Sequence, residues 1–250
     1  MELLQNLTPY FYRCRRIPLV TLRALHMNLI TRLTSLTLLA AAALAILGGC
    51  GNQPDNAIAA NPDAVRPVMI GQTAPPFELA AADGSRYRLD PAAMPGPAIV
   101  VFYRGGWCPY CAAHFMELRK AEDAIREMGY ELVFVSPDRP QKLAESLTQL
   151  EVEYTLLSDS DMEAAKAFGV AFEVDEATLN RYREIGIDLA ESSGRDHGLL
   201  PVPALFIIGS DGVIRFQYVN PNYKVRISEA LFVAAATAAL EQKPLKPMKK

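Results

Sequence analysis

The sequence predicts an α/β fold in which a central mixed sheet is flanked by helices on both faces. Apolar runs without polar alternation, such as 98–103, indicate strands that are buried on both sides. Segments with helical spacing of apolar residues, such as 109–128, separate these runs. This alternation is typical of a sheet covered by helices. At 250 residues, half of them apolar, the chain is long enough for one sizeable domain with a full core.

The N-terminal region has the pattern of a secretion signal. Residues 27–49 join a short charged segment to an apolar run that is too short to span a bilayer comfortably. The run ends in a Leu-Gly-Gly-Cys sequence that resembles a bacterial lipobox, which implies that Cys50 is lipidated as the first residue of a mature chain. We therefore expect a lipid-anchored protein of the cell envelope, on the periplasmic face of the membrane, with an uncleaved anchor as the alternative. Residues 1–26 fit this pattern poorly and form a doubtful extension.

The segments on either side of the domain differ from it in composition. Residues 50–66 are rich in Asn, Asp, Pro and Ala, which predicts a flexible tether before a domain at 67–242. The tail at 243–250 holds four lysines and two prolines and is expected to be disordered. Removal of the first 49 residues takes away five arginines and one glutamate, and leaves 20 basic against 27 acidic residues. This acidic balance does not suggest a nucleic-acid partner.

The first half of the domain contains a hairpin and a strand–helix–strand unit. Two short runs, 77–81 and 86–89, flank an Asp-Gly turn, which predicts the β-hairpin. Strand 98–103 leads into helix 109–128, which is followed by a glycine suited to the position after a helix. Strand 131–135 completes the unit, for which we expect the right-handed connection.

The second half continues the alternation and adds an insertion. Apolar spacing and turn residues predict these elements in order: helix 141–150, strand 154–157, helix 161–168, a helical insertion at 175–190, a hairpin of strands 204–208 and 213–219, and a last helix at 227–241.

Two cysteines, Cys108 and Cys111, form the most specific motif of the chain. They follow a buried strand and a Gly-Gly pair and stand at a predicted helix start, where the backbone favours a thiolate. Cys108 is therefore the expected nucleophile, and Cys111 the thiol that resolves its mixed disulfide. Pro109 suits the first helical position. Half of a zinc site is the alternative, but a closed site needs about four ligands. The other candidates are scattered, so we expect neither metal nor cofactor: Cys14, Cys50, His114 and His197.

These residues resemble a known superfamily. The sequence from Trp107 to Cys111 resembles the redox motif of thioredoxins, in the Cys-Pro-Tyr-Cys form found in glutaredoxins. Segments 70–84 and 200–214 resemble the peroxiredoxin branch, also called the alkyl hydroperoxide reductase and thiol-specific antioxidant family. The resemblance covers about residues 68–240. It implies a thioredoxin-like fold with an N-terminal hairpin extension and a helical insertion before a cis proline.

The resemblance also implies residues around the cysteine pair. Pro203 is expected to be cis, which leaves the backbone of Val202 free to pair with a bound peptide. The insertion at 175–190 is expected either to lie over the cysteine pair or only to cover the sheet.

Residues next to the cysteines in sequence are further candidates for the site. Trp107 is expected to shield and pack the disulfide, and Pro109 and Tyr110 to line the substrate surface. Arg104 is the nearest cation in sequence to Cys108, and it is either a stabiliser of the thiolate or a solvated loop charge.

The site departs from both family patterns. Peroxiredoxins carry a threonine or serine three residues before the reactive cysteine and a proline four residues earlier, and here these positions hold Gly105 and Val101. The arginine that binds peroxide in that family would fall near Pro203 and is absent. The buried acid of thioredoxins is replaced by Phe102.

Three functions therefore remain open. In the first, which we narrowly favour, the chain reduces hydroperoxides through a Cys108 sulfenic acid that Cys111 resolves. In the second it exchanges disulfides with proteins of the envelope. The third, a redox-inert binding scaffold, leaves the cysteine pair unexplained. The first two functions require an external dithiol reductant, either thioredoxin-like or a membrane reductase.

Overall fold

The computed structural model describes residues 58–150, 154–242 and 248. The predicted extension at 1–26, the signal at 27–49 and the lipidated Cys50 lie outside the described residues, as does most of the predicted tail. Across the described ranges, the structure contains no helix with the length and apolar character needed to cross a membrane.

The main sheet of the described chain has seven strands in the order β2-β1-β5-β4-β3-β8-β9. Their bounds are β1 Phe77–Ala81, β2 Arg86–Leu89, β3 Ala98–Phe102, β4 Glu131–Ser136, β5 Thr155–Ser158, β8 Ala204–Ile208 and β9 Ile214–Val219. Strands β3, β4 and β5 run parallel, whereas β1, β2, β8 and β9 pair antiparallel with their neighbours. The predicted mixed sheet and both predicted hairpins are therefore confirmed.

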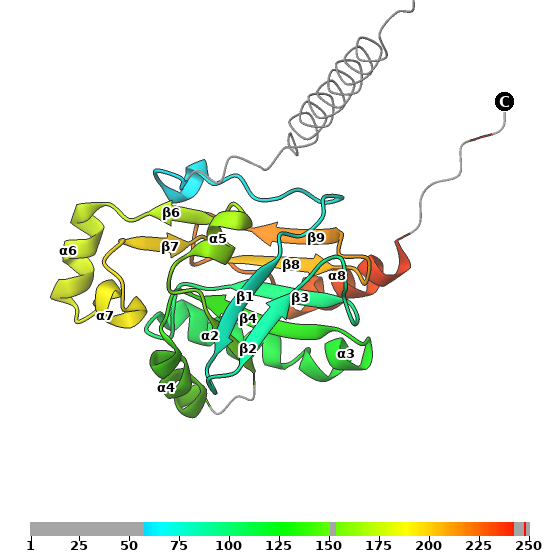
Figure 1. Ribbon diagram of the computed structural model, residues 1–250, viewed down its shortest axis with the longest axis horizontal. Helices are drawn as coiled ribbons and strands as arrows, with labels where there is room; N and C mark the ends of the chain where they lie inside the picture. The colour runs from blue at the N-terminus through cyan, green and yellow to red at the C-terminus, as the bar shows by residue number, and fades with distance from the viewer. Residues whose placement is uncertain (1–57, 151–153, 243–247, 249–250) are drawn as a thin grey trace, which may run out of the picture. The chain divides into compact units, whose positions relative to one another are not determined.

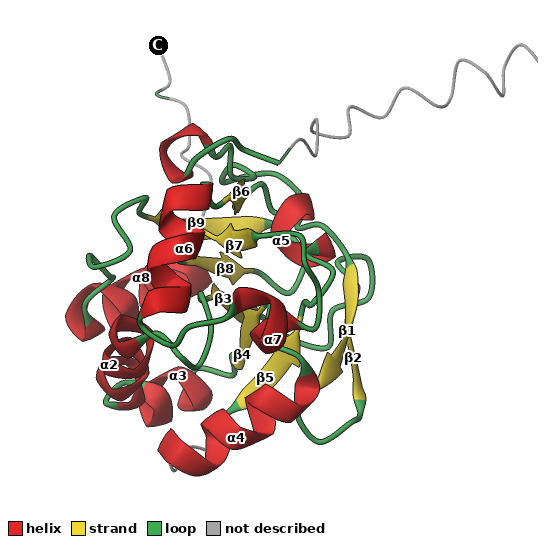
Figure 2. Ribbon diagram, turned by 90° about the vertical axis from the view of Figure 1, so that its left-hand side faces the viewer, coloured by secondary structure: helices red, strands yellow, loops and turns green. Residues whose placement is uncertain are grey.

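Helices cover both faces of this sheet, and a small second sheet adjoins the insertion (Figure 1). The other elements are η1 Pro62–Ala64, α2 Pro109–Arg119, α3 Glu122–Glu127, α4 Pro140–Leu150, α5 Glu163–Ala167, β6 Ala171–Glu173, α6 Glu176–Glu184, α7 Leu189–Ser193, β7 Leu199–Pro201 and α8 Glu229–Glu241. Figure 2 shows α2, α3 and α8 together on one side of the sheet and α5 on the other. The pairing of β6 with β7 was not predicted, because each strand has only three residues.

Strand β3 determines which face of the sheet receives the cysteine pair. Its residues alternate between two apolar clusters, so Ile99 and Val101 pack on the side of α2, α3 and α8, and Val100 and Phe102 pack on the side of α5. Because both faces are covered, every residue of the strand is buried. Both cysteines belong to the cluster on the α2 side.

The predicted helix at 109–128 consists of two helices, α2 and α3. The break lies at Lys120 and Ala121, whose N–H groups bond to carbonyls three residues back instead of four. Leu118 and Ile125 on either side of the break are both fully buried. The sequence has neither glycine nor proline at this point, so it carries no signal for the break.

The prediction of a flexible tether at 50–66 is wrong for residues 58–66, which are the part of it that the structure describes. Ala59 donates its N–H to Ala171 O (3.1 Å) and accepts from Glu173 N–H (2.9 Å), which adds it as a bridge beside β6. The short helix η1 follows, capped by the Asn61 side chain. The domain therefore includes residues before Pro67, because the unpaired edge of β6 binds this segment through its backbone.

Candidate active site

The cysteine pair lies where β3 ends and α2 begins. Cys108 is the N-cap of α2, Pro109 occupies the first turn, and the Cys111 N–H donates to Cys108 O at 2.9 Å. The predicted helix start is thus confirmed. Both cysteines are free thiols and each is only 1% exposed.

The Gly105-Gly106 turn before Cys108 has no room for side chains. Gly105 has φ +145°, and a Cβ there would lie 2.3 Å from the Trp107 Nε1 atom. A Cβ on Gly106 would lie 2.0 Å from Ser146 Oγ, while its N–H donates to Asp138 Oδ2 at 2.7 Å. The threonine or serine of the peroxiredoxin pattern therefore cannot replace Gly105 in this backbone.

Arg104 lies beside the Cys108 sulfur. Its Nη1 is 3.8 Å from Cys108 Sγ, its Nη2 donates to the Tyr182 hydroxyl, and the residue is 4% exposed. The guanidinium carbon also lies over the aromatic rings of Trp107, Tyr182 and Tyr223, at 5.0, 5.5 and 4.1 Å from the ring centroids. Arg104 is therefore not a solvated loop charge, and its charge faces the sulfur.

The surroundings shift the pKa values of the two thiols in opposite directions. The pKa of Cys108 falls to about 6, first because the Cys111 thiol donates to its sulfur and then because Arg104 lies nearby, and these effects outweigh the opposing effect of burial. Burial and the neighbouring Cys108 raise the pKa of Cys111. Near neutral pH, Cys108 is thus the thiolate and Cys111 the thiol that donates to it.

The predicted cis proline is wrong, because the Val202–Pro203 peptide bond is trans. These residues join β7 of the two-stranded sheet to β8 of the main sheet. The backbone of Val202 is also not free to pair with a peptide, since its N–H already donates to Val170 O at 2.8 Å. Pro203 is buried and lines a cavity that Arg104 also lines.

The remaining predicted residues surround the pair at different depths. Trp107 is half-buried and packs against Tyr182, with ring centroids 5.6 Å apart. Pro109 and Tyr110 are exposed, and Tyr110 contacts Tyr223 edge to face at 5.5 Å. Because Tyr182 belongs to α6, the insertion does more than cover the sheet and reaches the residues around Cys108.

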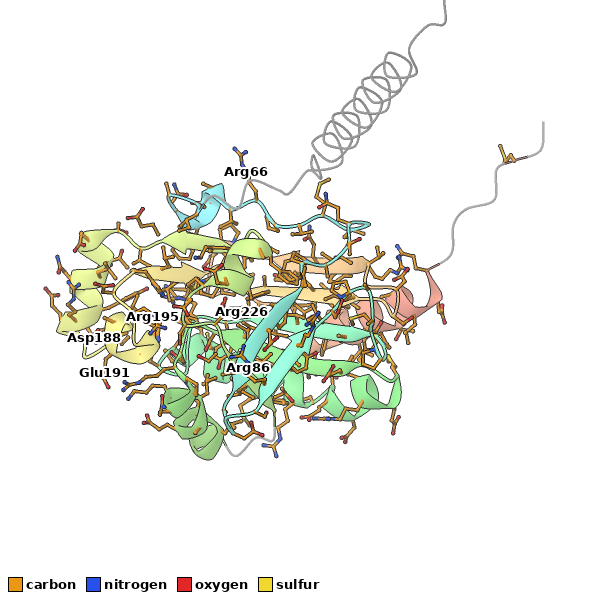
Figure 3. The ribbon with its side chains drawn as sticks, in the orientation of Figure 1. Arg66, Arg86, Asp188, Glu191, Arg195 and Arg226 are labelled. Atoms are coloured by element: carbon orange, nitrogen blue, oxygen red, sulfur yellow. The ribbon has the colours of Figure 1, made fainter. Side chains whose placement is uncertain are left out.

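Sequence reasoning missed four residues of the site: Asp138, Tyr182, Tyr223 and Arg226. Asp138 follows β4, whereas Tyr223 and Arg226 come from the loop that joins β9 to α8, in which Figure 3 labels Arg226. The sequence carries no motif for that loop, so only the fold brings it to the cysteines. Among the described residues, no group of three or more His, Cys, Asp or Glu side chains is arranged to hold a metal ion.

The cysteine pair stands at the start of α2, the helix that follows the interior strand β3 of the main sheet. The pattern of the AhpC/TSA family matches residues 70–217, and the chain belongs to that family. It is 31% identical to peroxiredoxin Bcp of Escherichia coli K12 over 107 residues, which are 42% of this chain and 67% of that protein.

Solved structures agree on the fold. Peroxidoxin BcpB from Mycobacterium tuberculosis aligns with a TM-score of 0.54 at 21% identity, over 71% of this chain and 99% of that one. A peroxiredoxin-like protein from Aquifex aeolicus aligns with a TM-score of 0.54 at 18% identity, over 73% and 98%. The predicted thioredoxin-like fold is thereby confirmed. The family match and the Escherichia coli relative indicate that the chain is an oxidoreductase enzyme.

Proposed function

We propose that the chain reduces hydroperoxides through Cys108. The Cys108 thiolate attacks the outer oxygen of R–O–O–H, so that an S–O bond forms, the O–O bond breaks, and the alkoxide leaves and takes up a proton as R–OH. Cys111 then attacks the sulfenic sulfur, the S–S bond forms, and hydroxide leaves with the proton of Cys111 as water. An external dithiol returns both cysteines to thiols and becomes a disulfide itself.

The observation that carries this proposal is the burial of a charged Cys108 sulfur beside Arg104. A hydroperoxide is small enough to approach Cys108, which is 1% exposed. A protein disulfide carries its polypeptide backbone with it, and that backbone would have to fit against the same buried sulfur. The guanidinium 3.8 Å away supplies a donor for the oxygen on which charge develops. Arg104 thus offers the positive group that the family pattern places near Pro203.

A cavity of about 230 Å³ next to Arg104 supports organic hydroperoxides as substrates. It is lined mainly by apolar and aromatic side chains, among them Pro62, Phe172, Val174, Pro203 and Tyr223. Such a lining suits the carbon chain of an alkyl hydroperoxide, with the peroxide group at the Arg104 end.

Stopped-flow oxidation of the reduced protein tests the proposal, with hydrogen peroxide, cumene hydroperoxide and a disulfide-bonded protein as alternative oxidants. A thiol of pKa about 6 is mostly ionised at pH 7, so its thiolate fraction is about 30-fold that of a free cysteine, although each low-pKa thiolate is a weaker nucleophile. We expect peroxide to oxidise Cys108 more than about 30-fold faster than a free cysteine, because Arg104 also stabilises the departing oxygen. Oxidation no faster than that of a free thiol, or fastest with the protein disulfide, would contradict the proposal.

Two serine variants are the matched controls. Cys108→Ser should abolish peroxide consumption, because it removes the nucleophile. Cys111→Ser should keep the first step and stop at the sulfenic acid, which dimedone traps for mass spectrometry. Full activity in Cys108→Ser would show that another group reacts with peroxide.

A further inference from the structure

The resolving thiol, Cys111, lies in a place that opposes its reaction. It is 1% exposed, and burial raises the pKa of its thiol above the ordinary value. To form the disulfide, Cys111 must attack the oxidised Cys108 sulfur as a thiolate. A thiol that stays neutral because it is buried therefore reacts slowly. Some group must therefore favour the anionic form of Cys111 once Cys108 has been oxidised.

Arg226 is placed to do this. It comes from the loop between β9 and α8, and its Nη2 is 3.6 Å from Cys111 Sγ. Its Nε donates to Tyr223 O at 2.7 Å, which fixes the guanidinium over the sulfur. Its Nη1 is buried without a partner, and within the described residues no carboxylate pairs with Arg226. The positive charge is therefore not neutralised by an acid and faces Cys111.

The other titratable groups around Cys111 do not take this role. Tyr103, directly after β3, is fully buried, and burial raises the pKa of its hydroxyl. His114, on the next turn of α2, is neutral because burial and Arg226 lower its pKa to about 4. Arg104 holds its guanidinium at Cys108, whose thiolate charge itself raises the pKa of Cys111. Arg226 is the cation that opposes these effects.

We propose that Arg226 is a further catalytic residue, which stabilises the Cys111 thiolate as it attacks the oxidised Cys108 sulfur. This inference rests on the proposed function. In the step itself the S–S bond forms, the S–O bond breaks, and the proton given up by Cys111 leaves with hydroxide as water. In the reverse direction, Arg226 holds Cys111 as the thiolate that departs when an external dithiol attacks Cys108.

Transient kinetics of an Arg226→Gln variant test this role, because the single tryptophan, Trp107, stands next to Cys108 and reports both steps by fluorescence. We expect the second phase, disulfide formation, to slow by at least about tenfold, the effect of losing a hydrogen bond from a charged group. The first phase, sulfenic acid formation, should change by less than about threefold. The longer-lived sulfenic acid should also react with more peroxide to give sulfinic acid, which mass spectrometry detects.

Two further variants separate charge from loop structure. Arg226→Lys keeps the charge but loses the Nε donor to Tyr223. Its second-phase rate should therefore lie much closer to that of the wild type than to that of Arg226→Gln. Lys224→Gln removes an exposed charge of the same loop that lies over the Tyr110 and Tyr223 rings and not at either sulfur, so it should slow the second phase far less than Arg226→Gln does. An unchanged second phase in Arg226→Gln, or equal slowing in Arg226→Lys and Arg226→Gln, would overturn the proposal.

A measurement without peroxide separates failure of this inference from failure of the proposed function. In a Cys108→Ser background, the rate at which iodoacetamide alkylates Cys111 reports its pKa through the pH profile. Adding Arg226→Gln should move the midpoint of that profile to higher pH. No movement would overturn the role of Arg226 even if peroxide reduction is confirmed, and a clear movement would support it even if peroxide proves a poor substrate.

Discussion

The two sulfur atoms of the site have similar surroundings and opposite behaviour. Each is 1% exposed, and each has a guanidinium within 4 Å, Arg104 for Cys108 and Arg226 for Cys111. Yet the pKa of Cys108 falls and that of Cys111 rises. For Cys108, hydrogen bonds from the Cys111 thiol and backbone N–H outweigh the effect of burial, whereas for Cys111 burial is the largest effect and raises the pKa of its thiol. A nearby cation therefore does not by itself decide which thiol ionises first.

The two sulfurs also differ in that a Gly-Gly turn directly precedes Cys108. Of the substitutions considered, one in this turn should have the largest effect, a loss of protein stability. Gly105→Ala places a Cβ in a left-handed backbone and 2.3 Å from the Trp107 ring, so we expect about 3 kcal/mol less stability in urea unfolding. Gly84→Ala is the control, because Gly84 also has positive φ but has nothing within 4 Å of the added Cβ. Equal losses in the two variants would show that close packing at Gly105 is unimportant.

The Arg104 side of the comparison should give the next largest effect. A hydrogen bond to a charged group contributes about 1.5–3 kcal/mol, so Arg104→Gln should slow the reaction of Cys108 with peroxide at pH 7 by about 10- to 100-fold. In the wild type, alkylation of Cys108 should rise with pH through a midpoint at about 6 and then level off, because the thiolate is the reactive form. In Arg104→Gln that midpoint should lie at higher pH. An unchanged midpoint would mean that Arg104 does not stabilise the thiolate.

Much of the fold and the centre of the site were predictable from local patterns. The apolar run of β3, the Asp-Gly turn of the first hairpin and the Cys-Pro-Tyr-Cys helix start each depend on neighbouring residues, and each was found where it was expected. The break between α2 and α3 and the pairing of Ala59 with β6 depend on contacts between distant segments. No local pattern in the sequence could reveal them.

The cations and aromatic rings of the site show the same limit. Arg104 precedes Cys108 by four residues and was a candidate, but the choice between thiolate stabiliser and solvated charge required its burial and its contact with Tyr182. Arg226 lies 115 residues after Cys111 in sequence and reaches it only through the loop after β9. The trans bond at Pro203 likewise differs from what the family resemblance implied.

The smallest expected effect concerns Asp138, whose negative charge acts on the ionisation of Cys108 and not on that of Cys111. Burial raises the pKa of this carboxyl to about 6, and its charge and that of Cys108 disfavour each other. Asp138→Asn keeps an oxygen for the Gly106 N–H but removes the charge that forms above pH 6.

The Asp138→Asn variant should therefore make Cys108 more acidic by a few tenths of a kcal/mol, which raises its thiolate fraction at pH 6 from about one half to about two thirds and its alkylation rate by about 1.3-fold. The midpoint for Cys111 should stay unchanged. Asp159→Asn is the matched control, because Asp159 is also a buried carboxyl with a raised pKa, about 7, but its oxygens accept from Ala164 and Ala165 at the start of α5. Equal changes at Cys108 in both variants would indicate a general loss of stability, whereas a change in Asp138→Asn alone would show that this carboxylate acts on the nucleophile directly.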